Sequence, residues 1–485
     1  MRSFLVIPAV ALAVLVQGQV IDTVLFTPLG AFQFPYSVGT ISQSAYSCKL
    51  DRMGRPYAYV CCRELGLVTF DISDPLMPVP TDTLAPAQLS GLAVNNVEQD
   101  GALLYLSVGG FEGTAQYAGL ATVDVNDPEA PVVLDVWYDT QFQNGAAIAQ
   151  VQDDVAYLGA MDDGVVVLDV SDPLGIGFLS SFQPDPGWPG IVSYAPQARG
   201  MAVRDTVLYL AYDAGAFRTI DIRDPYALAQ LGQYVNPDHP LFTPNATNNV
   251  VLKGDHAILT YDFCGIEVVD ISDPTDPQQE SWTNPWNCGF GTWFGSDGHT
   301  NELMLVRNDS LLFVSGGDSE LLVYDATQLP ALTLVGANGP PNDSTATWGL
   351  DVLGDRVIGC YLNNSFIAFP PQPFHANWGG VRLFDWQLDI TTRITDRSGT
   401  GAIALYPNPA RDQVLVQWRL GASPDRYQLQ DMMGRLVRSG PVVADAGAAA
   451  MRLDLSNLSD GTYAFDLTGS DMHRVARLIV ANGHR

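Results

Sequence analysis

The chain has 485 residues, 47 % of them hydrophobic, and it contains 45 glycines and 32 prolines. With 53 acidic against 24 basic residues its formal net charge is −29, a balance that repels nucleic acids and anionic membranes and excludes both as expected partners. This length and composition are typical of an all-β protein with one large and one small domain.

The N-terminal segment has the features of a secretory signal peptide. Arg2 supplies a positive charge, residues 4–16 are apolar, and residues 16–18 provide a small-residue cleavage site. The apolar run is too short to cross a bilayer and no later run is long enough, so we expect no transmembrane segment. We therefore expect residues 1–18 to be a signal peptide and the mature chain to be exported.

A ten-residue unit recurs seven times along the following part of the chain. The copies are GLVTFDISDP (66–75), GLATVDVNDP (119–128), GVVVLDVSDP (164–173), AFRTIDIRDP (216–225), GIEVVDISDP (265–274), ELLVYDATQL (320–329) and GVRLFDWQLD (380–389). The strand-final aspartates follow one another at intervals of 45 to 60 residues. A period of this size is typical of a β-propeller, with one small sheet per repeat.

The residues of the unit account for its expected structure. In the copy at 164–173, four consecutive apolar residues predict a strand that is buried on both faces, as stacked blades require. Asp169 then ends the strand, because its carboxylate can accept hydrogen bonds from backbone N–H groups of the next turn, in which Pro173 fixes φ. Since this aspartate recurs at every strand end, we interpret it as turn chemistry and not as a catalytic or metal-binding group.

The unit resembles the LVIVD repeat of bacterial and archaeal surface proteins. The matching pattern is a tyrosine-containing strand, a short hairpin, four apolar residues after Gly, and Asp-apolar-Ser-Asp-Pro, as in YLGAMDDGVVVLDVSDP (157–173). The resemblance covers roughly residues 24–386. It implies a seven-bladed β-propeller over residues 19–386 and does not imply one particular reaction.

Residues 24–32 precede the first repeat but resemble the strand that follows Asp-Pro elsewhere, as in residues 227–235. The last repeat has no clear strand of this kind after Asp385. We therefore predict that residues 24–32 form the outermost strand of the blade that contains Asp385, which closes the ring and removes two sheet edges. Short stretches rich in small residues, at 91–94 and 200–203, predict innermost strands.

The long loops indicate which face of the propeller carries function. In four-stranded antiparallel blades, the loops between the second and third strands share one face with the loops between blades. We call this the long-loop face, because the long loops all fall there: residues 109–118, 183–197, 236–247, 283–299 and 362–379. Loops of this length are usually functional or disordered, and their aromatic residues favour order.

We predict that any ligand is contacted from the long-loop face. The candidate residues are Trp286, Trp293, His299, Phe374, His375 and Trp378. Aromatic side chains can stack on sugar rings or peptide side chains, and histidines supply the polar groups that orient a ligand. The alternative is that the aromatic side chains point inward and cover the channel as a small core.

No catalytic residue, metal ligand or cofactor is predicted. Asp297, His299 and Glu302 carry groups that suit a metal or acid–base site, but they are neighbours in an ordinary polar loop. The sequence shows no Cys-x-x-Cys pair, nucleophile elbow, phosphate loop or dinucleotide fingerprint. Whether the protein is an enzyme stays open at this point, with a non-enzymatic role favoured.

The cysteines suggest one disulfide. Cys264 lies in the hairpin of the fifth repeat and Cys288 in the loop that leaves the same blade, so both fall at one end of one blade. Disulfides persist in exported proteins, and we expect these two residues to form one.

The C-terminal part has another pattern. Residues 387–402 lose the repeat and form a linker, and residues 403–485 show strands separated by turn signals, which predicts a small Ig-like β-sandwich. This stretch resembles the type A C-terminal sorting domain of the type IX secretion system. The matching residues include Tyr406, Pro407, Asn408, Pro409, Gly434, Gly461 and Tyr463. The resemblance implies the type IX machinery as partner and export through the outer membrane of a Gram-negative bacterium, with release or attachment at the surface.

Together these features predict an exported cell-surface or secreted propeller that acts as a binding or adhesion scaffold for an unknown extracellular ligand, a glycan or a protein. The alternative is an extracellular hydrolase or lyase that acts on glycans or peptides from the same face. A purely structural surface-layer component is a third reading. A semi-buried cluster of His, Asp and Glu at the channel mouth would favour the enzyme, and solvent-facing aromatic side chains would favour binding.

Overall fold

The structure is a computed structural model, and it divides into two compact units, Met1–Thr391 and Thr392–Arg485. It describes residues 23–35, 44–111, 116–190, 194–239, 245–286, 288, 298–339, 345–363, 376–389, 403–418, 423–431, 435–444, 450–469 and 472–481. The signal-peptide segment 1–18 and residues 390–402 of the predicted linker 387–402 therefore lie outside the described residues, whereas residues 387–389 belong to the strand Gly380–Asp389. Among the described residues, no helix is long and apolar enough to span a membrane.

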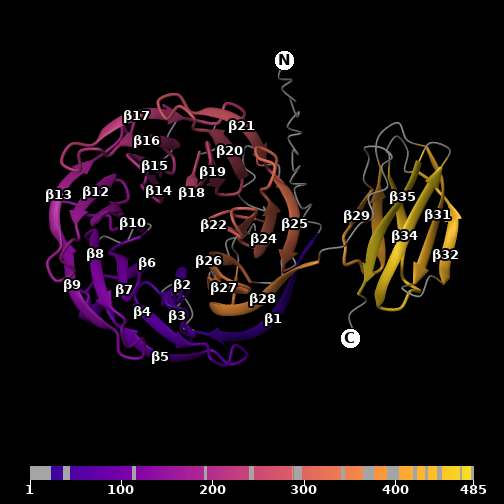
Figure 1. Ribbon diagram of the computed structural model, residues 1–485, viewed down its shortest axis with the longest axis horizontal. Coiled ribbons are helices and arrows are strands. Elements are labelled where there is room, and N and C mark those ends of the chain that lie inside the picture. The colour runs from indigo at the N-terminus through magenta and orange to yellow at the C-terminus, as the bar shows by residue number, and fades with distance from the viewer. Residues whose placement is uncertain are drawn as a thin grey trace, which may run out of the picture. The chain divides into compact units, whose positions relative to one another are not determined.

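Seven four-stranded antiparallel sheets of the first unit surround a central axis, as Figure 1 shows. The first three blades, from the axis outwards, are β2 (Ser47–Leu50), β3 (Tyr57–Cys61), β4 (Leu67–Asp71) and β5 (Val79–Leu84); β6 (Val94–Asp100), β7 (Leu103–Val108), β8 (Gly119–Asp124) and β9 (Val132–Tyr138); and β10 (Ile148–Gln152), β11 (Val155–Gly159), β12 (Val165–Asp169) and β13 (Gly177–Phe182). A short 3₁₀ helix, η2 (Pro86–Gln88), follows β5.

The next three blades repeat this order. They are β14 (Gly200–Arg204), β15 (Val207–Ala211), β16 (Phe217–Asp221) and β17 (Ala229–Tyr234); β18 (Thr247–Lys253), β19 (His256–Tyr261), β20 (Gly265–Asp270) and β21 (Gln278–Thr283); and β22 (Leu303–Val306), β23 (Leu311–Ser315), β24 (Leu321–Asp325) and β25 (Thr333–Asn338). Together with the seventh blade, which is described next, these six blades confirm the seven-bladed propeller predicted from the repeat.

The seventh blade is built from both ends of the first unit. Its sheet has the order β26 (Thr347–Leu353), β27 (Arg356–Tyr361), β28 (Gly380–Asp389) and β1 (Thr23–Gln33). β1 pairs antiparallel with β28, from Thr23 opposite Asp389 to Gln33 opposite Gly380. The prediction that residues 24–32 form the outermost strand of the last blade is confirmed, and the ring closes by strand pairing (Figure 1).

The repeated aspartates act as turn acceptors, as the sequence indicated. Asp169 Oδ1 accepts a hydrogen bond from Ser171 N at 2.9 Å, and Asp172 Oδ1 accepts one from Leu174 N at 3.0 Å. The same pair of bonds recurs in the first, second, fourth and fifth repeats. Hydrogen bonds from Ser171 lower the pKa of Asp169, which is the effect expected when donors stabilise a carboxylate.

The proline of the same turn joins neighbouring blades. Thr122 Oγ1 in β8 donates a hydrogen bond at 2.6 Å to the carbonyl of Pro173, which lies in the turn of the next blade. Ser180 donates in the same way to Pro225, again at 2.6 Å. Equivalent bonds join Thr219 to Pro274 and Ser281 to Pro330. The Asp-Pro turn therefore ends a strand and also gives the previous blade an acceptor.

One predicted innermost strand was wrong in position. Residues 91–93 do not belong to a strand, and β6 begins at Val94. Gly91 has φ +83°, so this segment turns before the strand starts. The prediction for residues 200–203 is confirmed by β14, which begins at Gly200.

The second unit is a small Ig-like β-sandwich. One sheet holds β29 (Ala404–Tyr406), β30 (Gln413–Gln417) and β33 (Ala450–Asp454), and the other holds β32 (Leu436–Pro441), β31 (Pro424–Asp431), β34 (Gly461–Gly469) and β35 (Met472–Val480). Val414, Leu429 and Phe465 are fully buried in the core that the two sheets share. The small β-sandwich predicted for residues 403–485 therefore matches the strands observed in the described part of this range.

The bond between Thr122 and Pro173 provides a test of the coupling between blades. Thr122→Val keeps the side-chain shape but leaves the Pro173 carbonyl without this donor, and we expect a loss of about 1–2 kcal/mol in the free energy of unfolding. Thr69 is the matched control, because it is equally buried two residues before its own Asp and its hydroxyl has no hydrogen-bond partner. Thr69→Val should be neutral or stabilising, and equal losses in urea denaturation of both variants would contradict the assignment.

Candidate functional site at the channel mouth

A buried aromatic group closes the axial channel at the long-loop face. The rings of Tyr46, Phe111 and Trp348 meet edge to face, with centroid separations of 5.9 to 6.2 Å. Ala147, Met161 and Leu362 complete the cluster, and all six residues are buried. We call these six residues the mouth plug. They come from segments next to innermost strands or after second strands, which is why blades far apart in sequence meet there.

Two charged pairs lie beside the mouth plug. Arg199 Nε is 3.3 Å from Asp213 Oδ2, and the Arg199 guanidinium lies 5.1 Å from the centre of the Phe111 ring. Tyr194 donates its hydroxyl to Asp213 Oδ1 at 2.9 Å. Burial raises the pKa of Tyr194, and the negative charge of Asp213 raises it further. This tyrosine is therefore held as a neutral donor.

The second pair joins His299 to Asp262. His299 Nε2 lies 3.1 Å from Asp262 Oδ1, and the imidazole stacks on Trp348 with 5.2 Å between ring centroids. Burial raises the pKa of Asp262, but the attraction of His299 outweighs this and the pKa is lowered. A carboxylate that orients a histidine is a common catalytic arrangement, but His299 is only 2 % exposed. The imidazole is therefore buried, whereas the Asp262 side chain is 20 % exposed.

Glu302 lies on the channel axis below the mouth plug. Its carboxylate accepts hydrogen bonds from Ser47 Oγ at 2.8 Å and from Leu350 N at 2.9 Å. Burial raises the pKa of Glu302 to about 7, against the lowering effect of these hydrogen bonds. A buried carboxyl that titrates near neutrality is the kind of group that functional sites use.

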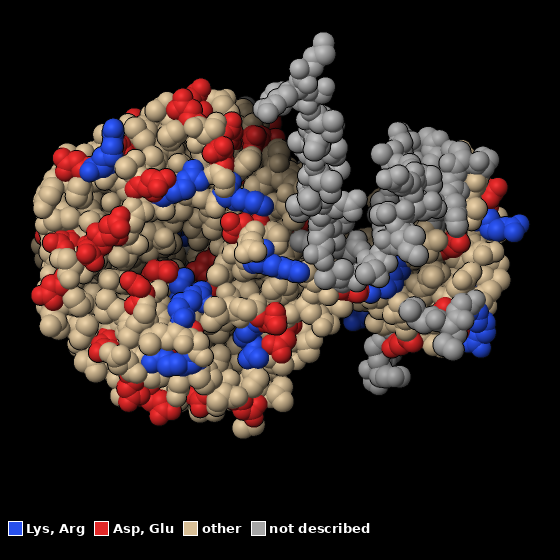
Figure 2. All heavy atoms as spheres, viewed as in Figure 1, with Lys and Arg blue, Asp and Glu red and all other residues tan. Residues whose placement is uncertain are grey.

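A cavity of about 530 Å³ follows the axis away from Glu302 along the innermost strands. Its wall carries the pair Lys49–Glu98, with 2.8 Å between Nζ and Oε2, and Asp351, which binds Arg52. Figure 2 shows a hollow at the centre of the ring, with basic and acidic side chains intermingled on the face around it. The channel is thus polar inside and closed by the mouth plug at the long-loop face.

The structure describes three of the six predicted ligand residues. Trp286 is half-buried against the core between the fifth and sixth blades, and Trp378 packs edge-on against Tyr361 with 5.4 Å between ring centroids. The Arg382 guanidinium also lies 4.7 Å from the Trp378 ring. His299 belongs to the buried pair with Asp262. Trp293, Phe374 and His375 lie outside the described residues.

Two residues that the sequence reasoning missed form an exposed aromatic pair on the long-loop face. Tyr117 and Tyr138 stack with 6.1 Å between centroids and 9° between ring planes. They are 38 % and 43 % exposed, so the fold does not use their outer faces. Tyr117 lies in the long loop 109–118, and the length of this loop already indicated the functional face in the sequence. Tyr138 ends the outermost strand β9, where no local pattern points to its partner.

A second polar cluster lies between the fourth and fifth blades. Glu267 is fully buried and accepts hydrogen bonds from the hydroxyls of Tyr234 at 2.6 Å and Tyr261 at 2.5 Å. Burial raises the pKa of Glu267 to about 7, although the tyrosine hydrogen bonds lower it. The His239 ring lies close to Tyr261, with 5.8 Å between centroids.

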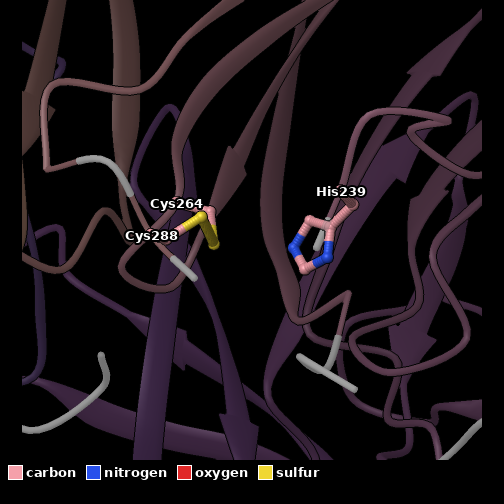
Figure 3. Close-up of side chains that lie close together, drawn as sticks. All are labelled: His239, Cys264 and Cys288. Carbon is pink, nitrogen blue, oxygen red and sulfur yellow. A yellow bond between two sulfur atoms is a disulfide. The ribbon is translucent and has the colours of Figure 1, made fainter. Parts of the chain in front are cut away.

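The structure joins Cys264 and Cys288 by a disulfide, with 5.1 Å between their Cα atoms. His239 approaches the two sulfur atoms, as Figure 3 shows, and the three ligand-type atoms lie within 4.8 Å of one another. Because thiolates and not disulfide sulfurs bind metals, this group is a covalent cross-link in the oxidised state.

One of the motif residues, Asn408, joins the start of the C-terminal unit to its last strand. Asn408 Nδ2 donates to Arg477 O at 2.8 Å, and Asn408 Oδ1 accepts from Ile479 N at 2.7 Å, which ties the Tyr-Pro-Asn-Pro segment to β35. Tyr463 is buried and donates to Ser459 O at 2.7 Å, and Tyr406 is exposed. Pro407 and Pro409 are exposed, Gly461 begins β34, and Gly434 lies outside the described residues.

Comparison with protein families agrees with both resemblances. Residues 404–481 match the family described as secretion system C-terminal sorting domain. Residues 56–80, 148–182 and 245–281 match the LVIVD repeat. The sorting domain indicates export to the cell surface or the extracellular space and interaction with the type IX secretion machinery. No curated protein gives a significant match.

Comparison with solved structures agrees with the fold. A chain of the structure entitled "Crystal Structure of Mitotic Checkpoint Complex" superposes with a TM-score of 0.51 and 12 % sequence identity, over 79 % of this chain and 98 % of that one. The structure entitled "Crystal structure of RRP9 WD40 repeats" gives a TM-score of 0.50 and 10 % identity, over 75 % and 100 %. Identities this low establish the propeller architecture alone.

The raised pKa of Glu267 predicts a pH dependence of stability. The folded state keeps a proton that the unfolded state has lost between about pH 5 and pH 7, so the free energy of unfolding falls as pH rises through this range. A shift of this size corresponds to roughly 3 kcal/mol. Glu267→Gln should remove this part of the decline in urea titrations at pH 5 and pH 8. Glu129→Gln, which removes an exposed carboxyl, is the control, and an equal slope in wild type and Glu267→Gln would contradict the assignment.

Proposed function

We propose that the propeller is an exported binding scaffold that recognises an extracellular glycan or protein on its long-loop face. On this proposal, residues 1–18 direct the chain into the periplasm of a Gram-negative bacterium, and the sorting domain then takes it through the outer membrane. The match of residues 404–481 to a sorting domain supports this route, because it indicates delivery to the outside of the cell. The axial channel has a polar wall and can hold solvent, which is compatible with a secreted protein but does not identify the ligand.

The observation that carries the proposal is the exposed stacked pair of Tyr117 and Tyr138. Exposed aromatic surface that the core does not need is costly to keep in water and is enriched at recognition sites. A tyrosine presents an apolar face for stacking and a hydroxyl for hydrogen bonding, which suits sugars and peptides equally. The pair also lies on the face that carries the long loops, so further contacts can come from the same side.

The charged pairs at the mouth favour binding over catalysis. His299 and Asp262 are the pair with the best catalytic chemistry, but Trp348 covers the imidazole. Trp286 and Trp378 are half-buried against neighbouring residues, so they support the loop face and leave contact with a ligand to their exposed edges. The exposed aromatic pair, in contrast, meets solvent in the conformation that the fold adopts.

The test replaces both tyrosines. We expect the double variant Tyr117→Ser and Tyr138→Ser to weaken attachment of protein-coated beads to immobilised glycans or to cells by roughly tenfold. Because both side chains are exposed, the unfolding free energy should change by less than about 0.5 kcal/mol per site. The measurements are bead attachment in flow and urea denaturation of the same preparations.

Tyr226→Ser is the matched control, because Tyr226 is 68 % exposed in an Asp-Pro turn on the opposite face. It removes the same chemical group at a distance from the long-loop face. If attachment falls equally in this control, the effect reflects general surface hydrophobicity. Unchanged attachment by the double variant would refute recognition through the tyrosine pair.

A further inference from the structure

A small cavity of about 30 Å³ lies between the mouth plug and the wider channel. Its wall is dominated by side chains that carry oxygen. They are Ser47, Asn95, Asn96, Asn248, Asn249, Asn301 and Glu302. These residues come from the first, second, fifth and sixth blades, at the start of each innermost strand. A cavity of this volume is large enough for an ion or a water molecule.

Backbone geometry aims three of the lining residues at the cavity. The register of the innermost strand shifts by one residue at Asn95 in β6, at Asn248 in β18 and at Trp348 in β26. Each shift is a β-bulge at the same position of its blade, and bulges redirect side chains next to functional sites. The same device therefore turns two amides and one indole inward on three separate blades.

The amide nitrogens of this ring are committed to neighbouring blades. Asn95 Nδ2 donates to Ala146 O, Asn248 Nδ2 to Thr300 O, and Asn301 Nδ2 to Trp348 O, each at 2.8 Å. In each case the acceptor belongs to the next blade, just before or at the start of its innermost strand. An amide whose nitrogen is fixed in this way has a fixed orientation, so a cation in the cavity would have to bind it through its oxygen.

Asn95 provides independent evidence for a bound species, because its buried side-chain oxygen has no hydrogen-bond partner. Its side chain is 6 % exposed and its Oδ1 has no hydrogen-bond partner, although its Nδ2 also reaches Gly109 O at 3.2 Å. A buried carbonyl oxygen without a partner costs about 1–3 kcal/mol, so such an oxygen is usually satisfied by water, an ion or a ligand. Asn95 is one of the residues that line this cavity.

Glu302 supplies the charge. It is the carboxylate in the cavity wall, and Asn96 Nδ2 donates to its Oε1 at 3.3 Å. Gly349 makes room for it, because a Cβ at this position would lie 2.8 Å from Glu302 Oε2 and 2.2 Å from Tyr46 O. The positive residue in the same wall, Arg199, is directed to Asp213 and to the Phe111 ring. Among the described residues that line it, the cavity thus has one carboxylate and five asparagine side chains.

From this geometry we infer that the axial cavity binds a single Ca²⁺ ion, held by Glu302 and by the side-chain oxygens of Asn95, Asn248 and Asn301. Oxygen ligands of carboxylate, amide and hydroxyl type in an irregular arrangement suit Ca²⁺, whereas Mg²⁺ demands a tight octahedron and keeps its waters. A single carboxylate predicts weak binding, in the range of roughly 0.1 to 1 mM that extracellular calcium modules use. The ion would tie three blades together at the point where the channel is closed.

The test uses Ca²⁺ alone on the full chain. Thermal unfolding in EDTA and in CaCl₂ from roughly 0.01 to 10 mM should give a Tm that rises with the logarithm of free Ca²⁺ above the dissociation constant. Glu302→Gln should weaken the apparent affinity by about tenfold or more, because it removes the charged ligand. Glu98→Gln is the matched control, since it removes a carboxylate from the wider channel and leaves the small cavity intact. MgCl₂ at equal concentrations controls for ionic strength.

Terbium luminescence keeps the proposal testable if Glu302→Gln does not fold. Tb³⁺ resembles Ca²⁺ in size and ligand preference, and the indole of Trp348 in the cavity wall should sensitise its emission. Trp348→Phe should lose most of this signal while Ca²⁺ still raises Tm. Three results would overturn the inference: no Tm shift at 10 mM Ca²⁺, equal shifts in wild type, Glu302→Gln and Glu98→Gln, or Tb³⁺ emission that Trp348→Phe does not reduce.

Discussion

The propeller depends on the closure of its ring. A ring of sheets is stable only if its first and last blades meet, and here the N-terminal strand β1 completes the sheet of β26, β27 and β28. The contact extends to the first blade, because Gly30 N donates to Pro75 O at 2.8 Å. Strand pairing satisfies backbone groups that would otherwise be exposed edges, and it fixes the last blade against the first. Asp-Pro turns end the third strands of the first five blades, and four of these turns, through Pro75, Pro173, Pro225 and Pro274, also accept hydrogen bonds from a neighbouring blade, so local turn chemistry and ring closure support each other.

Closure also decides where function can lie. Once the seven innermost strands are fixed around one axis, the residues at their starts meet across the channel although they are far apart in sequence. Tyr46, Phe111 and Trp348 close the channel there, and Glu302 lies just inside it. The rigid ring leaves the long-loop face as the place where sequence can vary without cost to the sheets. A scaffold of this kind suits an exported protein, and the sorting domain in the second unit supplies the means of export.

The repeat made most of the fold predictable, because the same strand and turn occur seven times and each copy tests the others. The sequence also predicted where the ring closes, because the last repeat has no outermost strand after Asp385 and residues 24–32 have the pattern of such a strand. The candidate site was less accessible. The sequence offered a plug of long-loop aromatic side chains as an alternative, but the rings of the mouth plug are those of Tyr46, Phe111 and Trp348, and of these three only Phe111 lies in a long loop. The bulges that turn Asn95 and Asn248 inward leave no sequence signal, because a bulge depends on pairing and not on residue type. His299 and Glu302 were noticed together, but their roles depend on Asp262 and Ser47 from other blades.

Native-state hydrogen exchange of the full chain tests ring closure most directly. If β1 closes the ring, its hydrogen-bonded amides and those of β28 should open with the same free energy as the middle strands of the other blades, such as β11. All seven blades should then lose protection together as denaturant is added. Exchange of β1 amides at a much lower free energy, with β28 still protected, would show that the N-terminal strand frays independently and would contradict the account.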